Sequence, residues 1–434
     1  MRGTTFRRAG IVAAAVSAAL ILSACSGGGT EAGSDAPELS DEPVTITLSW
    51  WGGDARAELT QQAIDAFEEE HPNITVEPQY ADWTGYWDQL ATATAAGDSA
   101  DVVQMDELYL ASYGTRGALY DLGGDLVDTT DFPAEIVKTG YVDDAQYAVP
   151  IGMTTYAMVA NADLFEQYGI ELPDDETWTW DDYAALAKEI TEKSGGAIHG
   201  SSLIGGWDIG SVRYWGRQFG SEVFDGTKVT LDPEALTEMW QTQLDMIADG
   251  GMESADAIVE SQTAGLAGSS MATGKVALGT LWNTQITAVT AASGADLRLL
   301  KLPEPKGEDP NFYKPSMFWA VSSQSEHPAE AALLVDFLVN SEAAGEIIKT
   351  ERGIPANDSI RAFVADSLEP TDQQAVEFLD RVTPGPAFTT PNGASAMEGI
   401  FQRYTQEVLA GQTSPEDAAK ATIAELQAEV DAAN

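Results

Sequence analysis

Apolar and polar residues follow two different periods along the chain. Every second residue from Val44 to Trp50 is apolar, which is the period of a half-buried β-strand. Residues 54–70 carry apolar side chains at four-residue spacing and stop before His71-Pro72, so they are predicted to form a helix that ends ahead of a proline. Further strands are predicted at 74–76 and 101–105, each followed by a helical segment.

This alternation continues in a second region beyond residue 150. A helix is predicted at 180–192, begun by Thr179, and strands are predicted at 274–278 and 318–322. Alternating strands and helices predict an α/β protein with open, largely parallel sheets. The ligands of such sheets bind beyond the carboxyl ends of the strands, so residues at those ends are the candidates for function.

The first segment of the chain has the composition of a targeting signal. Arginines precede an apolar stretch at 11–22, which is too short to span a bilayer and is typical of a secretory signal. The following Leu22-Ser23-Ala24-Cys25 resembles the lipobox of bacterial lipoproteins, in which the cysteine is lipidated after cleavage. Residues 1–24 are therefore predicted to be a lipoprotein signal peptide, Cys25 the lipid anchor, and residues 25–42 a flexible, acidic tether.

Charge and motif content exclude several classes of function. The chain has 22 basic and 69 acidic residues and a net charge of −47, so nucleic acids would repel it and no nucleic-acid partner is expected. A GxSxG nucleophile motif is absent, and the glycines at 268 and 274 fail as a phosphate loop because Val276 stands where the magnesium-binding hydroxyl is needed. With a single cysteine and three scattered histidines, no catalytic residue, metal site or cofactor is predicted.

The aromatic residues suggest a different chemistry. The chain has 11 tryptophans, and several of them lie beside glycine or polar residues, as in Trp51-Gly52, Trp207-Asp208 and Trp282-Asn283. Sugars have apolar faces that stack on indole rings and hydroxyl groups that bind to carboxylates and amides. Together with Asp106 at a predicted strand end, these pairs indicate a carbohydrate-binding site, although any one tryptophan could equally fill a core.

Several segments resemble a known family. They are SWWGGDARAELTQQAIDAFEEEHPNITV, AQYAVPIGMTTYAMVANADLFEQYGIELP followed by WTWDDY, ATGKVALGTLWN, SMFWAVSSQSEHPAEAALLVDFLVN and RGIPAN. In this order, and behind a lipobox, they resemble the extracellular solute-binding proteins of bacterial ABC importers, in the sugar-binding group that includes maltose-binding protein. The resemblance covers nearly all of the chain beyond the signal peptide.

This resemblance implies two α/β lobes joined by hinge strands, with the ligand held in a cleft between them. Lobe 1 is expected at 43–150 plus 317–352, and lobe 2 at 151–316 plus 353–434. Matching motifs place in the cleft Trp51, Gly52, Asp106, Trp282, Asn283, Ser316, Met317 and Arg352. Loop position and residue type add Trp83, Tyr86, Trp207 and Asp208. Maltose-binding protein has an acidic residue in the hinge segment where this chain has Thr154-Thr155-Tyr156, so the pattern of hydroxyl binding differs, maltose itself is not implied and the ligand stays open.

The expected function is a monomeric, lipid-anchored receptor that captures a mono- or oligosaccharide by lobe closure and delivers it to ABC permease subunits. Its place would be the outer face of the cytoplasmic membrane, on the extracellular or periplasmic side, with the lipid as its only membrane contact. A polyol or another neutral polar solute is an alternative ligand. The alternative functions are a secreted carbohydrate-active hydrolase, whose paired carboxylates a sequence cannot reveal, and a surface sensor with the same fold.

Overall fold

The computed structural model describes residues 37–434 except residues 125, 305–309 and 387. Residues 37–434 form one compact unit. The predicted signal peptide, the Cys25 anchor and the first part of the tether lie outside the described residues. None of the helices in the described part of the chain combines the length and the apolar character that a membrane span requires.

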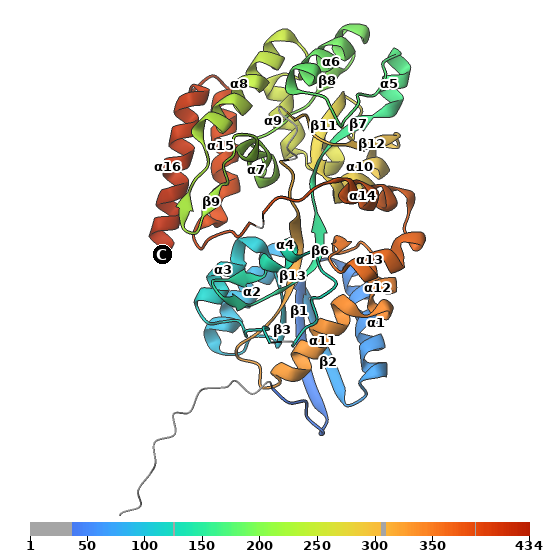
Figure 1. Ribbon diagram of the computed structural model, residues 1–434, viewed down its shortest axis with the longest axis vertical. Helices are drawn as coiled ribbons and strands as arrows, with labels where there is room; N and C mark the ends of the chain where they lie inside the picture. The colour runs from blue at the N-terminus through green and yellow to red at the C-terminus, as the bar shows by residue number, and fades with distance from the viewer. Residues whose placement is uncertain (1–36, 125, 305–309, 387) are drawn as a thin grey trace, which may run out of the picture. The chain divides into compact units, whose positions relative to one another are not determined.

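Lobe 1 is built on a six-stranded sheet. Its strands, in spatial order, are β14 (Ile354–Pro355), β6 (Val149–Thr154), β13 (Lys314–Val321), β3 (Val102–Met105), β1 (Val44–Trp51) and β2 (Ile74–Ala81). The alternation predicted for β1 continues as far as Trp50, after which Trp51 is buried as well. Around this sheet lie α1 (Asp54–Glu70), α2 (Trp83–Ala96), α3 (Glu107–Thr115), α4 (Ala134–Lys138), α11 (Pro328–Asn340), α12 (Glu342–Ile348) and α13 (Asp358–Val364) (Figure 1).

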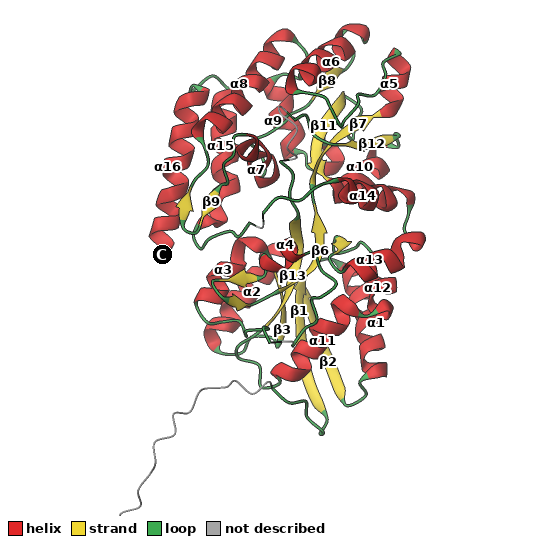
Figure 2. Cartoon of the chain, viewed as in Figure 1, coloured by secondary structure: helices red, strands yellow, loops and turns green. Residues whose placement is uncertain are grey.

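Lobe 2 is built on a four-stranded sheet in the order β12 (Leu297–Leu300), β7 (Tyr156–Asn161), β11 (Val276–Trp282) and β8 (His199–Ser201). Helices flank this sheet too (Figure 2). They are α5 (Ala162–Tyr168), α6 (Trp180–Lys193), α7 (Ile209–Gln218), α8 (Pro233–Asp249), α9 (Ala255–Thr263), α10 (Ile286–Ser293), α14 (Pro370–Arg381), α15 (Met397–Leu409) and α16 (Pro415–Ala433). Thr179 begins α6 as predicted, in a capping box with Asp182.

Short elements complete the fold. Two hairpins are formed by β4 (Tyr141–Val142) with β5 (Ala145–Gln146), and by β9 (Phe224–Asp225) with β10 (Lys228–Val229). Single turns of 3₁₀-helix are found at η1 (Leu266–Gly268), η2 (Asn283–Gln285), η3 (Ala365–Ser367) and η4 (Ala394–Ala396).

The prediction of largely parallel sheets is wrong, because both sheets are mixed. Strand β1 is parallel to β2 and β3, and β11 is parallel to β8. Strand β13 is antiparallel to β3 and β6, and β7 is antiparallel to β11 and β12. The physical reason is the return of the chain between sheets: β13 comes from lobe 2 and so enters the lobe 1 sheet from the end at which β1 and β3 leave it.

The chain passes between the two sheets at three places. Strand β6 runs into β7 through Thr155, residues 310–313 lead into β13, and residues 368–369 join η3 to α14 (Figure 1). The sequence predicts departure from lobe 1 at residue 352, but β14 still pairs with β6, and α13 contacts α12. Lobe 1 therefore extends to the end of α13, and the predicted boundary falls inside it.

Candidate ligand-binding site

The floor between the lobes is a buried network of polar hinge residues. Asn283, which is fully buried, accepts hydrogen bonds at its Oδ1 atom from Thr154 Oγ1 (2.8 Å) and from the backbone N–H of Thr155 (2.9 Å). Its Nδ2 atom donates to the Ala375 carbonyl at 2.9 Å, and Thr155 Oγ1 donates to Asn311 Oδ1 at 2.7 Å. These contacts use both ends of the Asn283 amide, so this predicted ligand residue ties the crossing from β6 to β7 to helix α14.

A cavity of about 260 Å³ opens in lobe 2 beside the end of β11. Three of the residues predicted from sequence line it together: Trp207, Asp208 and Trp282. The Trp282 ring packs edge-on against Tyr156, with 5.2 Å between ring centroids. A Cβ atom at Gly210 would lie 2.6 Å from Trp282 Cζ2, so only glycine lets the indole lie this close to α7. Trp282 is thus fixed in position, while part of its surface stays exposed.

Asp208 is held at the edge of this cavity by two elements. It is the N-cap of α7, accepting from the Ser211 N–H at 2.9 Å, and its Oδ2 accepts from the Tyr156 hydroxyl at 3.3 Å. Burial raises the pKa of Asp208 above its ordinary value. The pKa of Glu398, at the start of α15, is also raised, first by burial and then by the nearby charge of Asp208.

Lobe 1 and the hinge contribute further charges. Asp106 caps the N-terminus of α3 by accepting from the Leu108 N–H at 2.9 Å, and burial raises its pKa. The Nζ atom of Lys314 lies 3.4 Å from Glu107 Oε2 and 5.8 Å from the centre of the Trp282 ring. Burial by itself lowers the pKa of Lys314, but the carboxylates of Glu107 and Asp106 outweigh it and raise that pKa. An ammonium donor that is paired with a carboxylate therefore lies near the Trp282 ring.

The aromatic residues of lobe 1 form a cluster instead of a cavity. Trp51 contacts Trp83, Tyr86 and Trp87 with centroid separations of 5.0, 5.5 and 5.7 Å. Tyr86 is 1% exposed and donates its hydroxyl to the Gln104 carbonyl at 2.6 Å, and Trp51 is 9% exposed. Trp83, at 41% exposure, is the member of this group that offers a large surface to a ligand.

The other residues predicted in lobe 1 are engaged in packing. Arg352 is 1% exposed, donates from Nη2 to Thr60 Oγ1 at 2.8 Å and lies over the Trp319 ring, and burial lowers its pKa to about 9. The Ser316 hydroxyl donates to the Arg352 carbonyl. Met317 Sδ accepts from the Gln104 side chain at 2.9 Å. Gly52 lies against the Arg56 side chain.

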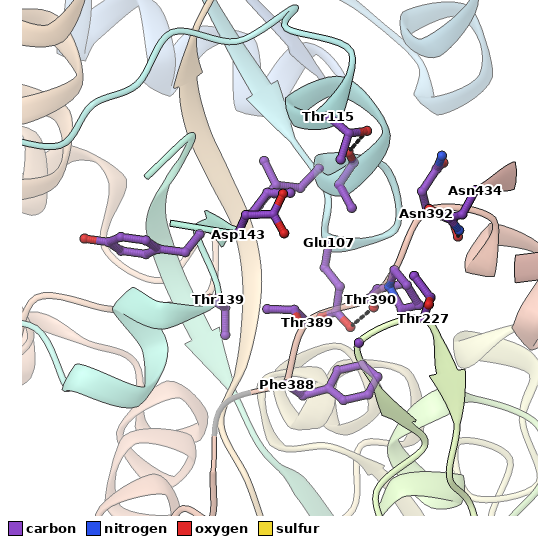
Figure 3. A pocket seen from close by; sticks show the side chains of 16 residues that line it. Glu107, Thr115, Thr139, Asp143, Thr227, Phe388, Thr389, Thr390, Asn392 and Asn434 are labelled. Atoms are coloured by element: carbon purple, nitrogen blue, oxygen red, sulfur yellow. Dashed lines mark hydrogen bonds between the residues drawn. The ribbon is translucent and has the colours of Figure 1, made fainter. Parts of the chain in front are cut away.

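A second cavity of about 260 Å³ lies between the lobes (Figure 3). Its walls come from α3, from the β4–β5 hairpin and from residues 388–392, and none of the residues predicted from sequence lines it. Glu107 Oε1 accepts a hydrogen bond from Thr390 Oγ1 at 3.0 Å, which connects α3 of lobe 1 to lobe 2. Glu107 and Thr390 were therefore missed, together with Tyr156, Lys314 and Glu398.

The sequence offers little signal for these missed residues. Tyr156 and Lys314 each directly follow a crossing between the sheets, which is a positional hint. Glu107 and Glu398 are two among 69 acidic residues and cannot be singled out by type. Among the described residues, no cluster of three or more histidine, cysteine or acidic side chains has the arrangement of a metal site.

Comparison with known proteins places this fold and cleft in a family. The model of the bacterial extracellular solute-binding protein family matches residues 62–377, and the chain belongs to this family. A putative binding protein of Brucella abortus is 31% identical over 193 residues, which are 43% of this chain and 45% of that relative. The match thus spans less than half the length of that relative.

Solved structures confirm the predicted two-lobed fold. The extracellular solute-binding protein family 1 structure from Alicyclobacillus acidocaldarius is 25% identical, with a TM-score of 0.73 over 90% of this chain and 99% of that one. A periplasmic oligogalacturonide-binding protein from Yersinia enterocolitica is 23% identical, with a TM-score of 0.75 over 89% of this chain and 99% of that one. The second likeness concerns the fold alone.

Proposed function

We propose that the protein is the sugar-binding lipoprotein of an ABC importer. The observation that carries this proposal is the lobe 2 cavity, in which the partly exposed Trp282 ring lies beside the carboxylate of Asp208. A fixed indole with adjacent acceptors suits a pyranose ring, which has an apolar face and hydroxyl groups at its edge. Membership of the solute-binding family supports a captured solute as the ligand. A protein of the same fold is named for binding an oligogalacturonide, which is one example of a carbohydrate ligand.

In this proposal the sugar first binds to lobe 2, and lobe 1 closes over it. Asp106 would accept hydrogen bonds from the sugar, Lys314 would donate to it, and Trp83 would cover it. The hinge between β6 and β7 would absorb the motion. Only contacts made better in the closed state can shift the equilibrium towards closure, so ligand groups must touch both lobes. The closed form would then be delivered to the permease without any bond being made or broken.

The proposed location follows from the lipobox. Lipidation of Cys25 would hold a monomer at the outer face of the cytoplasmic membrane, with residues 25–42 as the tether. Replacement of Cys25 by serine is expected to move the protein from the membrane fraction to the soluble fraction. Retention of this variant in the membrane fraction would contradict the lipid anchor.

The test of function is thermal unfolding of the mature protein with a panel of neutral sugars, uronates, polyols and their oligomers. A ligand at a hundred times its dissociation constant stabilises the fold by about 2.7 kcal/mol, which is a readily measured rise in melting temperature. Chromatography of the recovered sugar supplies the control for turnover. A selective rise with intact sugar is expected. Breakdown of the sugar would instead indicate a hydrolase, and the absence of any rise would contradict a sugar ligand.

A further inference from the structure

The carboxylate of Glu107 has a partner at each of its oxygen atoms, and the two partners belong to different parts of the fold. Oε1 accepts a hydrogen bond from Thr390 Oγ1 of lobe 2 at 3.0 Å, and Oε2 lies 3.4 Å from Lys314 Nζ at the start of β13. Glu107 and Thr390 are both buried, so solvent screens their contact little. Lobe 1 is therefore joined to lobe 2 by a buried hydrogen bond to a charged acceptor, which is the stronger kind.

This link is separate from the hinge. The chain crosses between the sheets at Thr155, at residues 310–313 and at residues 368–369, and α3 is no part of these crossings. Figure 3 shows the bond itself, with Glu107 reaching from α3 to Thr390. When the lobes rotate apart, the crossings absorb the motion as the pivot. A contact outside the pivot must then break, so this bond opposes the separation of the lobes.

Packing and charge at the same place act in the same direction. Leu108, the residue after Glu107, is partly buried against the core of lobe 2, and α3 contacts η4 of that lobe. Arg213 of α7, also in lobe 2, interacts electrostatically with Glu107. Burial lowers the pKa of Arg213 to about 9, and the carboxylates of Glu222 and then Glu107 act to raise it. The first turn of α3 thus has apolar, hydrogen-bonded and electrostatic contacts with lobe 2.

We propose that Glu107 is an interlobe latch, which holds the first turn of α3 on lobe 2 and favours the joined arrangement of the lobes before a ligand binds. The contact with Lys314 orients the carboxylate towards Thr390. Apparent affinity depends on the fraction of molecules in the binding-competent state, so a latch lowers the free energy that a ligand must supply for closure. This inference goes beyond the proposed function, because it concerns the protein without ligand and holds for any solute that the cleft binds.

Distances between spin labels on the two lobes test this latch without any ligand. The chain has one cysteine, so the mature protein with Cys25→Ser takes up labels only at two engineered positions. Ala95→Cys on α2 and Ala428→Cys on α16 place the labels at exposed residues, one on each lobe. Pulsed electron double resonance of the ligand-free protein is expected to give one main distance, that of the joined lobes.

Removal of the Thr390 hydroxyl is the main test. Thr390→Val keeps the shape of the side chain but leaves Glu107 Oε1 without its donor, so hydration of the carboxylate then favours separation of the lobes. The ratio of joined to separated lobes should fall about tenfold, which appears as a second, longer distance between the labels. Thr389→Val, at the exposed neighbouring residue, is the matched control and should leave the distances unchanged.

Glu107→Ala makes the outcome decisive. It removes the contacts with Thr390 and Lys314 together, so it should separate the lobes at least as far as Thr390→Val does. Adding Thr390→Val to it should change nothing more, because the shared bond is already absent. Circular dichroism checks that each variant is folded.

Two results would overturn the latch. In the first, the folded Thr390→Val and Glu107→Ala variants give the same distances as the Thr389→Val control. In the second, the double variant opens further than Glu107→Ala alone, by the full effect of Thr390→Val. Either result leaves the proposed function standing, because no sugar is used. A failure of all sugars to bind would contradict the proposed function and leave the latch standing.

Discussion

The two lobes differ in the exposure of most of their predicted ligand residues. In lobe 2, Trp207, Asp208 and Trp282 line one cavity and keep part of their surface exposed. In lobe 1, Tyr86 and Arg352 are each 1% exposed and form hydrogen bonds inside the fold. We therefore expect lobe 2 to present a preformed surface to the ligand. Most of the residues predicted in lobe 1 instead stabilise the wall that closes over the ligand.

The largest expected effect concerns stability in lobe 1. Arg352→Ala removes the hydrogen bond to Thr60 and the contact with Trp319, and breaks the 3.4 Å ion pair with Glu351. Loss of a fully buried side chain together with its charged hydrogen bond costs about 3 kcal/mol, so the free energy of unfolding in urea should fall by that amount. Sugar affinity of the folded variant should stay unchanged. Arg298→Ala, at an arginine that is 53% exposed, is the control and should have little effect.

A large loss of sugar affinity in the folded Arg352 variant would contradict a purely structural role for this residue. It would return this arginine to the ligand-binding set and give lobe 1 a direct charge contact with the ligand.

The next effect concerns binding in lobe 2. Trp282→Ala removes the aromatic surface of the cavity and should weaken sugar binding by about 2 kcal/mol, or roughly thirtyfold, as measured by isothermal titration. Trp180→Ala is the matched control, because this partly exposed tryptophan of the same lobe stacks on Trp215, with 4.6 Å between ring centroids, and does not line the cavity. Similar affinities for the two variants would remove Trp282 from the site.

Local patterns explain which parts of the fold could be predicted. Strand β1, helix α1 and the capped start of α6 depend on residue periodicity and on neighbours a few positions away, and the structure confirms all three. The mixed direction of the sheets was missed because it depends on how the chain crosses between lobes. No pattern within a short window carries that information.

The exposure of the candidate site residues is even harder to predict from short sequence patterns. Trp51 and Trp282 both lie at a strand end and precede a small or polar residue, so local sequence patterns do not distinguish them. Trp51 is covered by aromatic residues of α2, whereas Trp282 lies against Gly210 and leaves part of its ring open. Exposure is decided by segments that are distant in sequence, and this is also why Glu398 could not be found.

The smallest expected effect concerns the carboxyl group of Glu398 in lobe 2, whose removal should change stability and sugar binding in opposite directions. Burial, and after it the charge of Asp208, raises the pKa of Glu398 above the ordinary value of 4.5. Between the ordinary and the raised pKa, the folded protein keeps a proton that the unfolded chain has lost. The free energy of unfolding therefore falls as the pH rises through this window, and above both pKa values the deprotonated carboxylate destabilises the fold.

Glu398→Gln removes this titration and should raise the free energy of unfolding in urea at about pH 7, where an ordinary glutamate is fully ionised. The gain should disappear below pH 4.5, where the carboxyl group is protonated in both states. Glu429→Gln, at an exposed glutamate of the same lobe, is the control. Sugar affinity should fall in the Glu398 variant, since a charged acceptor in the cleft is lost. If the Glu398 variant had the same free energy of unfolding as the unmodified protein at neutral pH, the carboxylate of Glu398 would not destabilise the fold. The two lobes would then differ only in the exposure of their predicted ligand residues.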